Sequence, residues 1–171
     1  MKAEPLDPDD WPEYRTIRLA GLAEAPQAFS STLERESQFS EAQWRQRLTD
    51  RAQFVVRQGG QAIGTAGAYA EDGAAHLVAM WVAPDWRGRG VGDVLIPAVL
   101  DWARQDGYSA ISLWVTVGNK PAQGLYARHG FRSTGMIQPV RPDEPDHLEQ
   151  EMLHTLVTAP PGGPASVTAA T

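Results

Sequence analysis

The sequence predicts one mixed α/β domain of the α+β type, in which helices come first and an antiparallel meander of strands follows. Two apolar patterns with helical spacing occupy the first 50 residues. Glycine-containing turns at 59–60 and 71–73 then separate three apolar segments, as in successive hairpins. The third segment runs directly into a glycine-rich turn and a periodic helix, so the chain is organised around residues 76–93.

Capping residues and helix breakers define the elements of the first half. Asp9 or Asp10 can cap the first helix, which should end at the breaker Ala25-Pro26. Ser40 and Gln43 have the spacing of a capping box, which predicts a helix to about residue 50. The other expected elements are an edge strand at 2–6, a loop or short helix at 26–39, and strands at 54–57, 62–69 and 77–82.

The second half contains two predicted helices. One should run from residue 90 to Gln105, with Gly107 as its left-handed cap. Pro97 lies inside it and lacks an N–H, so we expect a kink or a distorted first turn. Asn119 can cap the other helix, which Gly130 should close. Strands are expected at 111–117, 131–137 and 148–157, with a loop at 139–146.

Composition limits the domain count and the partners. The length of 171 residues suits a domain at 1–157 followed by a low-complexity tail at 158–171 that we expect to be disordered. The net charge of -6 argues against nucleic acid or an anionic membrane as a partner. The chain has no cysteine, and His147 and His154 lack metal-ligand spacing, so we expect no metal. Without a signal peptide pattern or a long apolar run, a cytoplasmic protein is the expectation.

Residues 87–92, Arg-Gly-Arg-Gly-Val-Gly, join the third strand to a helix start. Free N–H groups and the positive end of the helix dipole form an anion site at such a junction, and glycine lets phosphates approach the backbone. Arg87 and Arg89 add charge-assisted donors, so we expect a diphosphate-bearing ligand. A P-loop is excluded because the turn has no lysine, and a dinucleotide fingerprint because Asp93 replaces its third glycine.

Several motifs follow one another in a specific order. Trp81-Val82-Ala83-Pro84 ends a strand and precedes Arg-x-x-Gly-x-Gly at 87–92. After the next strand come Asn119-Lys120-Pro121-Ala122 and the segment LYARHGF at 125–131. This order resembles that of the GNAT superfamily of acyl-CoA-dependent N-acetyltransferases, over about residues 62–153.

The resemblance implies a GNAT fold, with a mixed, mostly antiparallel sheet of six to seven strands, splayed at its centre and flanked by about four helices. Acetyl-CoA, the cosubstrate, would enter the splay between the strand ending at Val82 and the strand at 111–117. Tyr126 matches the tyrosine that protonates the departing sulfur. The implied cofactor-binding residues are Met80, Trp81, Val82, Arg87, Gly88, Arg89, Gly90, Val91, Gly92, Asp93, Asn119 and Tyr126.

The two positions where family members carry a carboxylate base hold other residues here. His76 occupies the first and could accept the ammonium proton directly or through water, or it could be a solvated residue at a strand end. Trp114 occupies the second and could line a substrate pocket or pack in the core. Glu149 or Glu151 on the last strand could attract an ammonium group, or could simply be solvated.

Two functional classes stay open at this point. The first is an N-acetyltransferase that moves an acetyl group from acetyl-CoA to a primary amine of a small molecule or peptide, by direct attack in a ternary complex. Ribosomal-protein N-terminal acetylation is its alternative substrate class. The second is an acyl-CoA-binding sensor module without turnover. Because family members often dimerise through the sheet or its last strands, a homodimer is also an open expectation.

Overall fold

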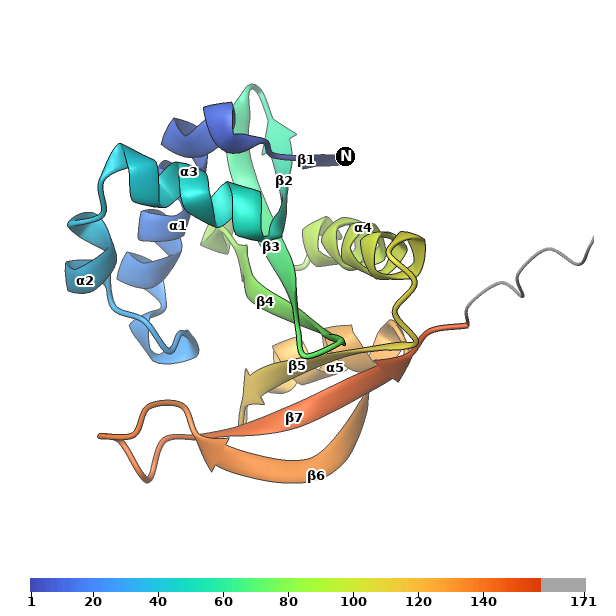
Figure 1. The fold of residues 1–171 in the computed structure, drawn as a ribbon. Coiled ribbons are helices and arrows are strands. Elements are labelled where there is room, and N and C mark those ends of the chain that lie inside the picture. The colour runs from blue at the N-terminus through green and yellow to red at the C-terminus, as the bar shows by residue number, and fades with distance from the viewer. Residues whose placement is uncertain (158–171) are drawn as a thin grey trace, which may run out of the picture.

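Seven strands form one sheet in the order β1-β2-β3-β4-β5-β7-β6 in the computed structural model, which describes residues 1–157 (Figure 1). All neighbouring strands are antiparallel except β4 and β5, which are parallel, so the expected mixed, mostly antiparallel sheet is confirmed. The predicted tail at 158–171 lies outside the described residues. The strands are β1 (Ala3–Pro5), β2 (Ala52–Gln58), β3 (Gln61–Glu71), β4 (Ala74–Val82), β5 (Ala110–Thr116), β6 (Arg132–Pro139) and β7 (Leu148–Thr155).

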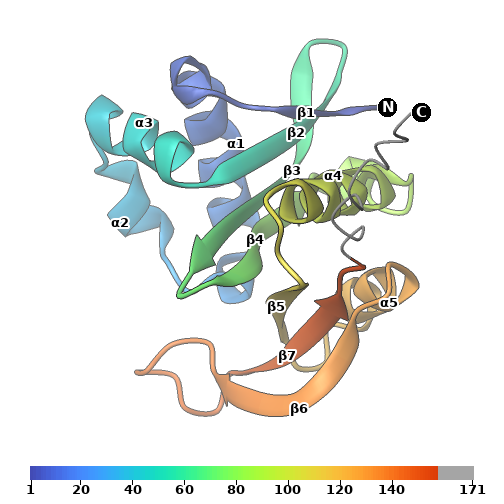
Figure 2. The same cartoon turned by 45° about the vertical axis from the view of Figure 1, so that its right-hand side comes forward.

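Helices cover both faces of the sheet (Figure 2). One face packs against α1 and α3, and the other against α4 and α5. Adjacent residues of β2 show this division, since Val55 belongs to the core under α1 and α3 while Val56 belongs to the core under α4. Within residues 1–157 the α-helices are α1 (Trp11–Glu24), α2 (Leu33–Ser37), α3 (Glu41–Asp50), α4 (Val91–Gln105) and α5 (Lys120–Arg128).

Most of the predicted caps and turns are confirmed. Ser40 and Gln43 form the expected capping box, and Gly107 has the expected positive φ of 81° after α4. Asp10 takes the predicted N-cap position of α1, but its side chain makes no capping hydrogen bond. The side-chain cap is made one turn earlier by Asp7, which accepts from the N–H of Asp9 at the start of a 3₁₀ turn that precedes α1. Pro97 lies inside α4, which runs through it without a break.

The sheet opens at its centre. β4 and β5 pair through Ala75 with Ile111 and through His76 with Ser112, and after these pairs the two strands diverge. The expected splay is therefore present, with its closed end at His76. A bulge also bends β4, because the register with β3 shifts by one residue between Thr65 and Gly67. Ala79 at this bulge has a φ of 54°.

No helix among residues 1–157 is both long enough and apolar enough to span a membrane. In the same part of the chain, no three histidine, aspartate or glutamate residues lie close enough together to form a metal site.

Candidate active site

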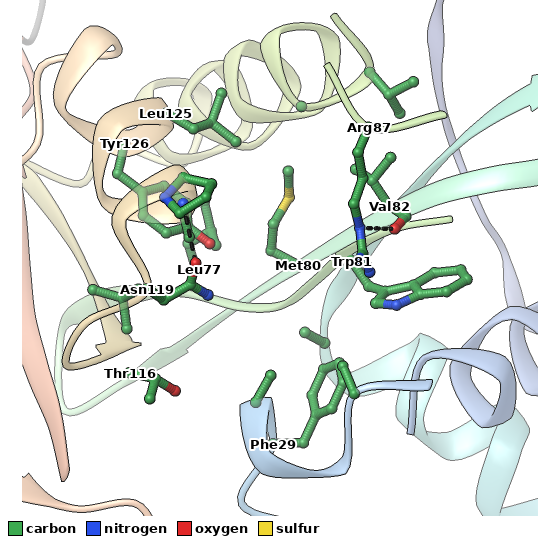
Figure 3. Close-up of a pocket in the computed structure, with 18 of the residues that line it drawn as sticks. Phe29, Leu77, Met80, Trp81, Val82, Arg87, Thr116, Asn119, Leu125 and Tyr126 are labelled. Carbon is green, nitrogen blue, oxygen red and sulfur yellow. Dashed lines mark hydrogen bonds between the residues drawn. The ribbon is translucent and has the colours of Figure 1, made fainter. Parts of the chain in front are cut away.

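A cavity of about 820 Å³ occupies the opening between β4 and β5 (Figure 3). Its walls come from five parts of the chain: the end of α1 with the segment that follows it, the second half of β4 with the turn after it, the first turn of α4, the end of β5, and α5. All of the predicted cofactor and catalytic residues line it except Arg89 and His76. The topology thus brings residues 80–93 together with Asn119 and Tyr126, as expected.

Val82 presents backbone groups to this opening. Ala83 donates its N–H to the carbonyl of Ile63 on β3, at 2.9 Å. Backbone groups of successive strand residues point to alternate edges, so the N–H and C=O of Val82 point away from β3 and toward the cavity. The carbonyl of Val82 accepts a hydrogen bond from Nε of Arg87 at 3.0 Å (Figure 3). The N–H at this edge can stabilise a developing oxyanion.

The turn after β4 delivers the N-terminus of α4 to the cavity. Gly88 and Gly90 have φ values of 71° and 81°, a left-handed backbone conformation that glycine adopts without steric cost. Gly90 is the N-cap of α4 and has no side chain to block the first N–H groups of the helix. This wall of the cavity is therefore suited to an anion, as the sequence predicted.

Asp93 in the first turn of α4 is compensated by two basic residues. Its carboxylate accepts from Nη2 of Arg128 at 3.1 Å and lies 2.8 Å from Nε2 of His129. Hydrogen bonding by His129, supported by Arg128 and opposed by partial burial, keeps the pKa of Asp93 below its ordinary value. An anion at the turn therefore meets a neutralised carboxylate instead of a free negative charge.

Tyr126 on α5 is 6% exposed and points into the cavity between Asn119 and Met80 (Figure 3). Its ring packs edge-on against Phe131, with centroids 5.9 Å apart. The Tyr126 phenol is protonated at neutral pH and so has a proton to donate. Burial raises its pKa further, because the apolar surroundings disfavour the phenolate.

Asn119 caps α5, as the sequence predicted. Its Oδ1 accepts from the N–H of Ala122 at 3.3 Å while the residue lines the cavity beside Tyr126. The cap fixes the first turn of α5, and so the direction in which Tyr126 points one to two turns later.

Two of the predicted site residues lie elsewhere. Nδ1 of His76 is 2.9 Å from Oγ of Ser112, and its ring stacks on Tyr69 at the closed end of the splay. This placement does not support His76 as the base. Arg89 lies outside the cavity lining, with its guanidinium 5.3 Å from the ring centroid of Trp86. The side chain of Arg87 also differs from expectation, since it is paired with Glu24 instead of being free for a phosphate.

Comparison with known proteins identifies the family to which this geometry belongs. Residues 12–131 match the family model described as the acetyltransferase (GNAT) family. The chain belongs to the GNAT family.

Solved GNAT structures share the fold over most of the chain. A GNAT-family acetyltransferase from Streptococcus pneumoniae superposes with a TM-score of 0.76 at 16% identity, over 91% of this chain and 98% of that one. The ribosomal-protein-S18-alanine N-acetyltransferase from Escherichia coli superposes with a TM-score of 0.67 at 21% identity, over 92% of this chain and 95% of that one. At these identities the likeness concerns the fold.

Sequence relatives match over shorter stretches. An uncharacterized N-acetyltransferase of Methanocaldococcus jannaschii is 38% identical over 64 residues, which are 37% of this chain and 28% of that protein. The mycothiol acetyltransferase of Clavibacter sepedonicus is 35% identical over 66 residues, or 39% of this chain and 22% of that protein. The matches thus span well under half the length of these two curated relatives.

Some residues of this GNAT cavity carry no sequence signal of their own. Glu24 and the segment to Phe29 form one wall of the cavity, yet in the sequence they show only the pattern of a helix end and a loop. Arg128 lines the cavity through its position on α5, one turn beyond Leu125. Of the alternatives left open for Trp114, the structure supports the pocket, because this residue lines the cavity.

Glu149 and Glu151 lie on the same face of the sheet as Trp114, but neither lines the cavity. Their strand partners on β5 are Thr116 and Trp114. Glu149 accepts from Nε2 of Gln138 at 2.8 Å, and Glu151 accepts from the hydroxyl of Thr134 at 2.8 Å. Burial raises the pKa of Glu149 despite that hydrogen bond and the nearby charge of His147. Both carboxylates are therefore engaged by neighbours on β6.

Proposed function

We propose that the protein is an N-acetyltransferase that moves an acetyl group from acetyl-CoA to a primary amine of a small molecule or peptide. The observation that carries the proposal is the cavity between β4 and β5, which joins an anion-binding turn, an exposed strand edge and a buried phenol. A cosubstrate with a diphosphate at one end and a thioester at the other fits that arrangement. Membership of the GNAT family supports the same assignment.

The residues divide into binding and chemistry. Backbone N–H groups of residues 88–92 would hold the diphosphate, and the free edge of β4 would hold the chain that follows it. Bound acetyl-CoA would supply an acetyl group activated as a thioester. The N–H of Val82 would stabilise the oxyanion as the amine nitrogen bonds to the carbonyl carbon. Tyr126 would donate its proton to the sulfur as the carbon–sulfur bond breaks.

We assign no protein base to the reaction. Among the described residues that line the cavity, the carboxylates are Glu24 and Asp93, and both are held in ion pairs with arginine. The ammonium proton of the acceptor would therefore pass to water. Alignment of the amine with the thioester then supplies much of the rate, and an amine that is partly neutral at pH 7 would react faster than one that is fully protonated.

The test is CoA release from acetyl-CoA over a panel of amines and peptides, with the mass of each acceptor measured before and after. A gain of one acetyl group on an acceptor, dependent on the enzyme, is the expected result. CoA release without an acetylated acceptor, or no release with any amine, would contradict the proposal.

A peptide α-amine is the second candidate acceptor. The Escherichia coli structure with the same fold carries the name of a ribosomal-protein-S18-alanine N-acetyltransferase. Since an α-amine has a pKa near 8, a site without its own base suits it better than a lysine-like amine. A short peptide that begins with alanine, compared with the same peptide blocked at its N-terminus, distinguishes this acceptor from side-chain amines.

A sensor module without turnover is the remaining alternative. It would bind acetyl-CoA and leave every amine of the panel unmodified. The buried phenol of Tyr126 beside the cavity favours turnover, because binding alone needs no acid at that position.

A further inference from the structure

One carboxylate in the lining of the cavity connects three segments of the chain. Glu24 ends α1, and its Oε2 accepts from Nε1 of Trp81 at 3.0 Å and from Nη2 of Arg87 at 2.6 Å. Its Oε1 accepts from Nη1 of Arg87 at 3.2 Å. The hydrogen bonds connect the end of α1 with β4 through Trp81, and with the turn before α4 through Arg87.

Two neighbouring features stabilise this arrangement. Gly21 lies one turn before Glu24 on α1, and a Cβ at that position would be 3.2 Å from the ring of Trp81. Glycine thus allows the indole ring to pack closely against α1 while its N–H reaches Glu24. Arg87 has a second anchor, because its Nε donates to the carbonyl of Val82.

The chemistry of Glu24 does not suit a base. The hydrogen bonds from Arg87 and Trp81 outweigh burial and lower the pKa of Glu24. Its charge is also compensated by Arg87, so it offers little to a cationic acceptor. The guanidinium of Arg87 faces α1 and β4, which leaves the diphosphate to the backbone N–H groups of the turn. These contacts fix the positions of Trp81 and Arg87, and other groups act on the reacting atoms.

We propose that Glu24 is a positioning residue for the acetyl-CoA turn. Through Trp81 and Arg87 it holds the end of β4 and residues 87–90 in the arrangement that receives the diphosphate and the thioester. The inference rests on the proposed function for the identity of the ligand. It adds that the cavity wall formed by the turn after β4 depends on a helix whose last residue, Glu24, lies 63 residues before Arg87.

Calorimetry with CoA on the full chain tests the proposal. Glu24→Gln keeps the size of the side chain and an acceptor for Trp81, but it removes the charge that pairs with Arg87. We expect CoA to bind about threefold to tenfold more weakly, as for a partly exposed charge-assisted hydrogen bond. Glu34→Gln on α2 is the matched control, because Glu34 is exposed and has no ion pair within residues 1–157, and its affinity should equal that of the wild type.

A double-mutant cycle distinguishes positioning from general damage. If Glu24 acts through Arg87, adding Glu24→Gln to Arg87→Ala should weaken CoA binding little further. Independent effects of the two changes would overturn the proposal. So would a Glu24→Gln variant that binds CoA as tightly as the wild type and the Glu34→Gln control.

Kinetics supply the second readout. The KM for acetyl-CoA should rise in Glu24→Gln while kcat at saturating acetyl-CoA stays within about twofold, whereas partial unfolding would lower kcat and leave KM unchanged. A fall in kcat alone would contradict a positioning role. A wild type that binds CoA but acetylates no amine would refute the proposed function, and the calorimetric comparison would still decide the role of Glu24.

Discussion

The parallel pairing of β4 and β5 places Nδ1 of His76 2.9 Å from Oγ of Ser112, at the closed end of the splay. The imidazole also stacks on Tyr69, with ring centroids 5.1 Å apart. Both contacts keep the ring away from the residues that line the cavity. The sequence left two alternatives open for His76, a base or a residue at a strand end. These contacts favour the residue at a strand end.

His76→Gln should therefore leave turnover nearly intact. Glutamine can retain a hydrogen bond to Ser112, and no reacting group needs the imidazole, so we expect kcat/KM to change less than about threefold. The measurement is CoA release with one acceptor amine from pH 6 to 9. A drop of about a hundredfold or more, the size expected for a lost general base, would restore His76 to the mechanism.

Tyr126→Phe should abolish most of the activity without weakening the fold. The variant keeps the aromatic contact with Phe131 and removes the phenolic proton, so we expect kcat to fall by about 10²- to 10⁴-fold. The affinity for CoA and the thermal unfolding midpoint should stay close to those of the wild type. Full activity in this variant would show that another group, or solvent, protonates the sulfur.

The same phenol predicts a pH dependence of stability. Burial holds the pKa of Tyr126 above its ordinary value near 10, so the folded state keeps the proton longer than the unfolded chain. The contribution to stability is then complete below pH 10 and is lost as the pH rises further. Urea denaturation at pH 9 and pH 11 should show a larger loss for the wild type than for Tyr126→Phe, and equal losses would contradict this assignment.

Gly90 and Gly73 provide a matched pair for the phosphate turn. Both have a φ of 81°, and a Cβ added at either would meet no atom within 4 Å. Alanine at either position should cost about 1 kcal/mol through the left-handed backbone. Only Gly90 lines the cavity, so the dissociation constant for CoA should rise in Gly90→Ala and stay unchanged in Gly73→Ala. Equal affinities in the two variants would place the diphosphate elsewhere.

Local signals explain why much of the site could be predicted from the sequence. The turn after β4, the cap at Asn119 and the position of Tyr126 each depend on residues within about two helical turns of one another. The order of the motifs then fixed which strands and helices surround the cavity. For these features, residues that are close in the sequence are also close in space.

The rest depends on contacts between distant segments. Glu24 pairs with Arg87 because the end of α1 lies beside the end of β4, and no sequence pattern predicts this ion pair. The surroundings of His76 could not be predicted from the sequence, because they depend on where β4 and β5 separate, which is set by pairing and packing of the whole sheet. Near α1, Asp10 occupies the predicted N-cap position but Asp7 makes the capping hydrogen bond, since several aspartates there satisfy the same rule.

Glu36 on α2 shows how such distant contacts hold the helices of the first half. Its carboxylate is fully buried and accepts from Nε and Nη2 of Arg18 on α1, both at 2.8 Å, and from Nη1 of Arg47 on α3 at 2.9 Å. Burial alone would raise the pKa of Glu36, but hydrogen bonds and charge from Arg18, with the charge of Arg47, lower it from 4.5 to about 2. Glu36→Gln should therefore destabilise the protein by about 3 kcal/mol at pH 7, because it leaves Arg18 buried without its counter-charge.

The sign of the pH effect makes the Glu36 prediction specific. Since the pKa of Glu36 is lower in the folded than in the unfolded state, its contribution is complete well above pH 4.5 and is lost as the pH falls toward 2. The stability difference between the wild type and Glu36→Gln, measured by urea denaturation, should therefore shrink as the pH falls from 7 to 3. Glu34→Gln, an exposed change on the same helix, should show only a small difference at every pH. A difference for Glu36→Gln that stays constant down to pH 3 would mean that shape, and not charge, accounts for the effect.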